Sequence, residues 1–385
     1  MTLKYYFNVL LLIYFLTPNG SVATSRLQLF KDVLDNHDAR VAPFDTTAEA
    51  IPLTVHINLM SIRGVSEREQ TFSTSMWLTL GWMDHRLSWN PSSYKGITSI
   101  IANSKNVWSP SSVCIYNEVK SEKCLTEDNP VTIMNIGWVA YTTTRESVTQ
   151  CTLNIRKYPF DSHVCSIYIG NLFEVSEFLL PQEQYSTISL THYEKNEEWD
   201  ITNSFSSLHQ TYDASLNLTL KQLHFHVEIK RRYTNVILSD LLPIILLSVL
   251  NIFCFLLPIE SGEKMGTSMA IFLTFAVFLT IINESMPKSD DTPYFSAYLL
   301  TQVLVSGITV VLESIVLHVH FQSSEDTSDN KVVPLDVDEK VDEKETKRRV
   351  CKFLKIDAKK LDRIFMISIV IINVVSLIYF LVQCQ

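Results

Sequence analysis

Two cysteines and the turn between them are the residues of this chain best suited to specific chemistry. Cys151 and Cys165 bracket thirteen residues, with the turn Tyr158-Pro159-Phe160-Asp161 in the middle of the segment. A cysteine pair at this spacing can close a small covalent loop, and the proline stiffens its apolar tip. Cys114 and Cys124 are a second candidate bridge, but four cysteines allow three pairings.

Acidic residues mark both ends of an apolar segment nearer the C-terminus. Glu260 and Glu263 precede it and Glu284 follows it. Steps of three or four residues place one stripe on a helix, consisting of Glu263, Gly266, Ala270, Leu273, Val277, Ile281 and Glu284. The 21 residues from Glu263 to Glu284 span about 31 Å of helix, enough to put a carboxylate near each membrane face. In one chain this stripe is equally consistent with core packing, whereas in a ring of subunits it would line a pore.

The elements that must position these residues fall into a polar first half and an apolar second half. Four apolar spans cover residues 241–257, 265–282, 295–317 and 364–382, each near the roughly 20 residues that cross a bilayer as a helix. Pro243 should loosen the first span locally. Residues 1–23 combine Lys4, a short apolar run and small residues, which is typical of a signal peptide. The net charge of −9 gives no indication of nucleic-acid binding.

Residues 24–233 show a helix-like start followed by the alternation of strands. The start has helical spacing from Thr24 to Asp35, and the alternation is clear around residues 53–59, 76–82 and 218–229. Strands at this spacing predict an all-β sandwich. Asn217 begins a glycosylation sequon in the same half. In the stretch between the third and fourth spans, residues 323–331 are expected to be disordered and the basic second half helical.

The order of cysteine loop and four spans resembles the Cys-loop family of pentameric ligand-gated ion channels, most closely nicotinic acetylcholine receptor subunits. The resemblance implies an extracellular immunoglobulin-like sandwich, a four-helix transmembrane bundle, a pentameric ring and a Cys151–Cys165 disulfide. It implies a signal peptide over 1–23, a ligand-binding domain over 24–233 and three transmembrane helices over 234–320. The second of these helices, 264–284, would line the pore. A cytoplasmic loop would follow over 321–360, then a fourth helix and an extracellular C-terminus over 361–385.

The same resemblance assigns roles to residues of the pore and of a coupling zone. Gly262-Glu263-Lys264 matches the inner mouth of cation-selective members, and Leu273 matches their central gate. Glu260 matches the cytoplasmic charge ring and Glu284 the outer one. The coupling residues would be Glu67, Pro159, Phe160, Asp161 and Arg231. Lys230-Arg231-Arg232 would then lie on the outer side, against the charge rule for loops, so pairing with carboxylates is expected.

The ligand site implied by the resemblance is incomplete. Its aromatic residues would be Trp82, Tyr116, Phe173 and Tyr212. Leu172 stands where the family has a central tryptophan, Ala214-Ser215 replace paired cysteines, and Leu220 replaces a tyrosine. Since aromatic rings bind quaternary ammonium groups by cation–π attraction, acetylcholine is not the expected agonist.

These observations predict a subunit of a cation-selective, ligand-gated channel in the plasma membrane. Its partners would be four further subunits of the same or other chains, a small-molecule ligand of unknown identity, the bilayer and permeating cations. The alternatives are an accessory or binding subunit that does not function as a homomer, or a channel gated by a ligand other than acetylcholine. An enzyme is not expected, since the sequence has no HExxH, Walker or nucleophile-elbow motif, and no cofactor or metal is predicted.

Overall fold

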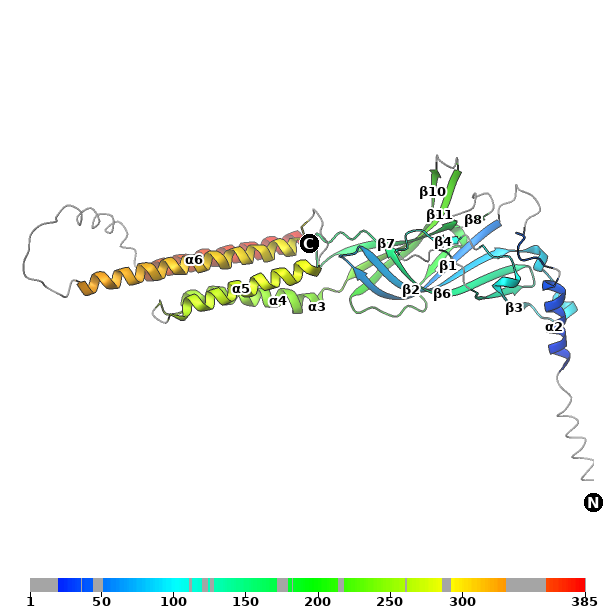
Figure 1. Cartoon of the computed structure of the whole chain (residues 1–385), viewed down its shortest axis with the longest axis horizontal. Helices are drawn as coiled ribbons and strands as arrows, with labels where there is room; N and C mark the ends of the chain where they lie inside the picture. The colour runs from blue at the N-terminus through cyan, green and yellow to red at the C-terminus, as the bar shows by residue number, and fades with distance from the viewer. Residues whose placement is uncertain are drawn as a thin grey trace, which may run out of the picture. The chain divides into compact units, whose positions relative to one another are not determined.

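The computed structural model describes most of the chain in two compact units (Figure 1). The described residues are 20–35, 37–43, 51–110, 113–119, 124, 128–171, 179–181, 183–213, 218–259, 262–285, 292–329 and 358–384. The first unit includes Gln70–Thr152 and His163–Ile229 with the chain before Glu67. The second unit joins Glu67–Glu69 and Leu153–Ser162 to the chain from Lys230 onward.

The first unit is the predicted β-sandwich. Within the described residues, one sheet has seven strands in the order β3-β5-β6-β2-β1-β8, with β9 also pairing with β1. The other has four strands in the order β10-β11-β7-β4. The strands are β1 (Ile51–Ser66), β2 (Thr71–Met83), β3 (Ser99–Asn103), β4 (Val113–Ile115), β5 (Pro130–Met134), β6 (Trp138–Gln150), β7 (Ser162–Asn171), β8 (Leu179–Pro181), β9 (Thr187–Ser189), β10 (Trp199–Asp213) and β11 (Leu218–Arg231).

Short helices complete the first unit. Helix α2 (Gly20–Leu34) confirms the helical start, and its Leu29 and Val33 pack into the sandwich core. The remaining helical turns are η1 (His85–Leu87), η2 (Pro91–Tyr94), η3 (Ser104–Asn106) and η4 (Glu183–Tyr185). Three of these turns begin after an Asp or Asn whose side chain accepts a backbone N–H bond, as helix caps commonly do.

Strand alternation builds the core of the sandwich. Along β2, Met76, Leu78, Leu80 and Trp82 are buried, whereas Trp77 and Thr79 are only partly buried. Because successive strand residues point to opposite faces, a single strand can supply both the core and the exposed surface of its sheet. The same period-2 pattern that predicted the strands therefore decides which side chains can meet a ligand.

In the described part of the second unit, four helical segments are long and apolar enough to cross a membrane. They are Thr234–Leu256, Glu263–Glu284, Tyr294–Phe321 and Ala358–Cys384, which confirms the four predicted spans. The elements are α3 (Thr234–Val236), η5 (Ile237–Leu241), α4 (Leu242–Phe253), η6 (Cys254–Leu256), α5 (Glu263–Ser285), α6 (Tyr294–Asp329) and α8 (Ala358–Cys384). Helices α5 and α6 run alongside one another, and α6 also contacts α8 (Figure 1).

Two local features differ from four regular α-helices that end with their apolar spans. The turn η5 is a π-helix that ends just before Pro243, where the missing proline N–H loosens the regular bond ladder. Helix α6 continues to Asp329, so the expectation of disorder from residue 323 is wrong for this part of the stretch. A helix started by an apolar span can propagate into polar residues, since each added residue costs little once the helix exists.

Polar side chains join the membrane helices to one another. The Ser248 hydroxyl donates to Gln302 Oε1 at 3.0 Å, and Gln302 Nε2 donates to the Ser376 hydroxyl at 3.1 Å. The Asn251 amide donates to Thr309 Oγ1 at 3.2 Å. In a bilayer such bonds help hold helices together, because lipid chains offer polar groups no partner. The first, third and fourth spans are thus linked through their interior.

Candidate functional site

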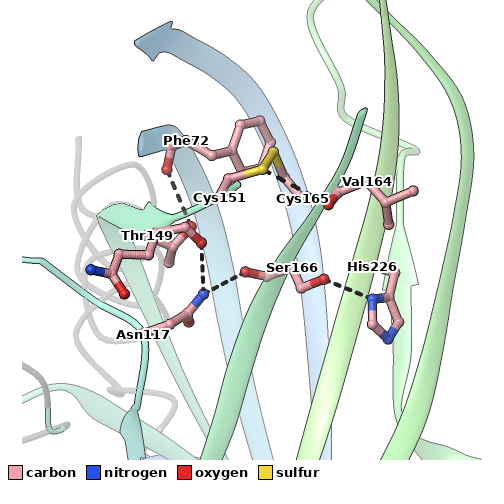
Figure 2. Close-up of a disulfide and its surroundings, with 9 residues drawn as sticks. Phe72, Asn117, Thr149, Cys151, Val164, Cys165, Ser166 and His226 are labelled. Atoms are coloured by element: carbon pink, nitrogen blue, oxygen red, sulfur yellow. Dashed lines mark hydrogen bonds between the residues drawn. A yellow bond between two sulfur atoms is a disulfide. The ribbon is translucent and has the colours of Figure 1, made fainter. Parts of the chain in front are cut away.

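Two disulfides lie in the first unit. Cys151 bonds to Cys165 and Cys114 bonds to Cys124, so the predicted pair and the second candidate bridge are both formed. Figure 2 shows the Cys151–Cys165 bridge beside the hydrogen bonds that join Asn117 to its neighbours, including the Ser166 carbonyl at 2.7 Å. The bridge closes a loop whose ends belong to the first unit, while residues Leu153–Ser162 between them belong to the second.

The tip of this loop meets the arginine that precedes the first span. Arg231 Nε donates to Asp161 Oδ1 at 2.8 Å, and Arg231 Nη2 donates to Asp161 Oδ2 at 3.2 Å. The same Nη2 also donates to Glu67, in the turn after β1. The Arg231 side chain is 7% exposed, that of Asp161 only 1% and that of Glu67 20%, so the ion triad joins a buried pair to a partly buried carboxylate. The structure therefore brings together three of the five predicted coupling residues as paired charges.

The electrostatics of this triad favour the charged arginine. Burial alone would lower the pKa of Arg231, but hydrogen bonds and charge from Asp161 and Glu67 raise it above its ordinary value. The Arg231 guanidinium also lies over the Tyr158 ring, 5.0 Å from its centroid. Tyr158 was absent from the predicted coupling residues, although its place before Pro159 at the loop tip could have indicated it.

The apolar residues of the loop tip pack on the helices of the same unit. The Tyr158 ring lies 5.6 Å from the Phe295 ring of α6, and the Phe160 ring 5.0 Å from that of Tyr233. The backbone N–H of Tyr294 donates to the Arg156 carbonyl at 3.1 Å. The tip thus contacts the start of α6 and the chain just before α3.

The acidic and apolar stripe of α5 is exposed within this chain. Leu273, Val277 and Ile281 are 60%, 56% and 58% exposed. The other stripe members described are exposed too, namely Glu263, Gly266, Ala270 and Glu284. The opposite side of α5 is buried and includes Ile271 and Phe275. Within the chain, the stripe is therefore not core packing.

The exposed side of α5 differs in composition from that of α8. Thr267 and Thr274 share the exposed side of α5, and their hydroxyls donate to backbone carbonyls four residues earlier at 2.9 and 2.8 Å. The exposed residues along the middle of α8 are almost all aliphatic, namely Ile364, Ile367, Ile371, Ile372, Val374, Val375 and Ile378. Aliphatic faces suit lipid, whereas a face with threonines and terminal carboxylates suits a water-filled path.

One of the predicted aromatic ligand residues, Trp82, does not lie at the surface of the sandwich. Trp82 is fully buried in the sandwich core, with its ring centroid 6.1 Å from that of Trp108, so its expected place on a ligand-facing surface is wrong. Five residues earlier, Trp77 is only partly buried and its ring lies 5.2 Å from that of His192. The alternation along β2 could have shown this, because Trp82 is in phase with Leu78 and Leu80.

Tyr116 and Tyr212 lie in the neighbourhood of the four-stranded sheet. Tyr116 follows β4 and is half-buried against Gly170, where an added Cβ would come within 3.1 Å of the tyrosine ring. Burial is the main cause that raises the pKa of Tyr116, opposed by a hydrogen bond from Gln222. Tyr212 is 62% exposed near the end of β10. Several predicted positions lie outside the described residues, namely Leu172, Phe173, Ala214, Ser215, Asn217 and Glu260.

Comparison with known proteins matches both halves of the chain. Residues 26–233 match the neurotransmitter-gated ion-channel ligand binding domain, and residues 241–336 match the neurotransmitter-gated ion-channel transmembrane region. The two matches coincide with the sandwich and with the first three membrane helices.

Individual relatives are acetylcholine receptor subunits. The chain is 24% identical over 306 residues to acetylcholine receptor subunit alpha-like 2 of Drosophila melanogaster, covering 77% of this chain and 53% of the relative. It is 29% identical over 300 residues to acetylcholine receptor subunit beta-type lev-1 of Caenorhabditis elegans, covering 77% and 57%. It is 25% identical over 317 residues to human neuronal acetylcholine receptor subunit alpha-10, covering 81% and 70%.

The chain spans little more than half the length of the insect and nematode relatives. The family itself rests on the domain matches, because the ligand-binding-domain match alone covers more than half of this chain. The sandwich followed by four apolar helices fits a multi-pass receptor of the plasma membrane. The chain therefore belongs to the neurotransmitter-gated ion-channel family, the Cys-loop receptors, whose members are pentameric ligand-gated channels.

Proposed function

We propose that this chain is a subunit of a cation-selective pentameric channel that a small extracellular molecule opens. The observation that carries the proposal is the exposed side of α5, with carboxylates at both ends and leucine, valine and isoleucine between them. In a ring of five such helices, the carboxylates would concentrate cations and the apolar rings would close the path by dewetting. Four further subunits, of this chain or of related chains, would complete the ring.

The ion triad of Glu67, Asp161 and Arg231 supports a route from ligand to pore. Arg231 belongs to the chain that enters the first span, and Asp161 belongs to the disulfide loop. Several hydrogen bonds to two carboxylates fix the position of the buried Arg231 side chain. A displacement of the disulfide loop would therefore move Arg231 with it, whereas solvated charges could rearrange independently. We assign Glu67, Asp161 and Arg231 to coupling, with Pro159 and Phe160 forming the apolar contact.

Reversal potentials test the selectivity. In cells with confirmed surface expression, dilution of external sodium chloride should shift the wild-type reversal potential as a cation channel requires. Glu263→Ala should reduce the preference for sodium over chloride, since a neutral ring no longer concentrates cations. Glu197→Ala removes an exposed carboxylate from the outer domain and should leave the ratio unchanged. A wild-type channel that prefers chloride would refute the proposal.

A second candidate is a channel, or an accessory subunit, that does not respond to acetylcholine. Leucines stand at two positions where the family resemblance implies rings, Leu172 and Leu220, and Trp82 lies in the core. Two missing rings, at about 0.5–2 kcal/mol each, would weaken binding of a quaternary ammonium up to nearly a thousandfold. The homomer should therefore give little or no current with acetylcholine. A robust current at micromolar acetylcholine would contradict this, and silence with every candidate ligand would favour the accessory subunit.

A further inference from the structure

The two charged residues that open α5 point in different directions. Glu263 is exposed on the stripe, whereas the next residue, Lys264, is fully buried. Lys264 Nζ donates to Asp362 Oδ1 at 2.8 Å and to Asp362 Oδ2 at 2.9 Å. It also donates to the Phe255 carbonyl at 3.3 Å and lies 5.4 Å from the centroid of the Phe255 ring. A lysine of the candidate pore helix is thus held by the first turns of α8 and by η6.

Stability alone does not explain this pair. Taking a lysine and an aspartate out of water costs free energy, and apolar residues of similar size often serve as well or better. Ionisable groups inside membrane segments usually have a role and a partner. Glu313 of α6 is buried too and interacts electrostatically with Lys264 and Asp362. Two carboxylates therefore lie near one ammonium, away from the exposed side of α5.

The position of Lys264 matters because of its neighbour. If both side chains of every subunit faced a pore, a ring of five positive charges would lie one residue from a ring of five negative charges. The fields of the two rings would largely cancel. With Lys264 turned inward and neutralised by Asp362, the charge of Glu263 acts alone on passing ions.

We propose that Asp362 is a positioning residue for ion selectivity, which holds the Lys264 ammonium inside the helix bundle so that Glu263 is uncompensated at the inner pore mouth. This inference rests on the proposed cation channel. It adds a residue of the fourth span, distant in sequence, to the determinants of selectivity in the second.

The electrical test compares single and double substitutions in the full chain, with Leu273→Ser as background to supply current without a ligand. Asp362→Asn should shift the reversal potential toward that of chloride, with a change of about threefold or more in the permeability ratio. Lys264→Gln together with Asp362→Asn should restore cation preference, because no lysine remains to be held. Asp362→Glu should keep the wild-type ratio, and so should Arg363→Gln, which removes an exposed charge from the adjacent position.

The outcomes separate this inference from the proposed function. A wild-type channel that prefers chloride overturns the function, whereas a cation-selective wild type with an equally selective Asp362→Asn overturns only the inference. Should Asp362→Asn fail to reach the surface, the double variant decides. Cation-selective current from the double variant supports the inference. If the double variant fails to assemble, the Lys264–Asp362 pair serves only the fold, and the inference is overturned.

A chemical test needs no current. The purified full-length protein in liposomes is treated with a water-soluble amine-acetylating reagent, and peptides are quantified by mass spectrometry. Lys264 should be protected in the wild type and in Asp362→Glu, but labelled in Asp362→Asn, with exposed Lys360 as the internal reference. Labelling of wild-type Lys264 at the rate of Lys360, or continued protection in Asp362→Asn, would overturn the inference.

Discussion

At the scale of single residues, Arg231 shows how a misplaced positive charge is accommodated. Lys230-Arg231-Arg232 lies just before the first span, where the charge rule for loops would place it on the cytoplasmic side. The structure gives Arg231 two carboxylate partners and an aromatic ring, so this residue is part of a folded site and not a topology signal. A buried pair of this kind is costly to break, since the remaining charge loses its counter-ion inside the protein.

Replacing Arg231 should therefore destabilise the protein more than replacing its neighbour. Arg231→Gln removes the ion pairs that join it to buried Asp161 and to Glu67, and should cost about 3–5 kcal/mol. Arg231→Lys should have a stability between those of the wild type and Arg231→Gln, because an ammonium keeps the positive charge but cannot form the two parallel hydrogen bonds to Asp161. Thermal unfolding of the purified full-length protein measures the effect, with exposed Lys230→Gln as the control. Equal Tm values for Arg231→Gln and Lys230→Gln would show that the triad contributes nothing.

Leu273 is the residue on which the gate prediction depends. It is 60% exposed at the middle of the α5 stripe, so five copies would form an apolar ring. Leu273→Ser adds a hydroxyl that lowers the cost of wetting the ring, and spontaneous current is expected. Holding current before ligand addition measures this, with Ile371→Ser on the aliphatic side of α8 as the matched control. Unchanged leak in Leu273→Ser would place the gate at Val277 or Ile281.

At the scale of elements, strands β10 and β11 carry a cluster of histidines. The rings of His209 and His224 are stacked at 4.9 Å, and those of His224 and His226 are 6.0 Å apart. The Tyr168 ring of β7 lies 4.0 Å from His224. Burial, followed by the charges that His209 and His226 would carry, lowers the pKa of His224 from 6.5 to about 4. His224 is therefore uncharged near neutral pH.

This shift predicts that acid destabilises the sandwich. A histidine with a lowered pKa binds its proton more readily in the unfolded chain, so its contribution is complete above about pH 6.5 and is lost as the pH falls toward 4. His224→Gln should flatten the decline of Tm between pH 7.5 and 5. His37, His56 and His226 also have lowered pKa values and should leave a residual slope. His85→Gln, at an exposed position, should match the wild type; an unchanged slope in His224→Gln would count against the prediction.

Sequence patterns predicted the elements well where one local signal dominates. The apolar spans and the strands follow from periodicity, which each element carries in its own residues. The wrong prediction for Trp82 came from its residue type, whereas the phase of β2, which the sequence also carries, places Trp82 in the core with Leu78 and Leu80. The extension of α6 to Asp329 shows a limit of such patterns, since helix propagation crosses a change in composition.

At the scale of the whole molecule, the Cys151–Cys165 disulfide links the chain just after β6 to β7, two segments whose relative position no local sequence pattern predicts. Cys151→Ser should lower surface expression, because a lost native disulfide commonly costs about 2–5 kcal/mol. Surface biotinylation measures this, with Cys254→Ala, which removes a free thiol, as the control. Peptide mapping without reduction should recover Cys151 joined to Cys165 and Cys114 joined to Cys124. Free thiols at Cys151 and Cys165 would contradict the bridge.

Pairings between distant residues were the part that the sequence could not supply. Lys264 and Asp362 are separated by 98 positions, and no periodic signal connects them. Each could be expected to need a partner near the membrane, but the choice of partner depends on how the helices pack. The pairing of Arg231 was predictable because the family resemblance named acidic residues of the same zone, and Tyr158 was indicated by its place at the loop tip. Asp362 had no such guide.

The division of the chain into units has a consequence for building hybrid receptors. Glu67–Glu69 and Leu153–Ser162 are encoded within the stretch that forms the sandwich, yet they belong to the compact unit of the membrane helices. A hybrid joined at a single crossover between Ile229 and Lys230 would give the helices a foreign loop tip opposite their own Arg231. Recombination therefore has to exchange three stretches of coding sequence at once, which makes the two units of this chain hard to shuffle independently.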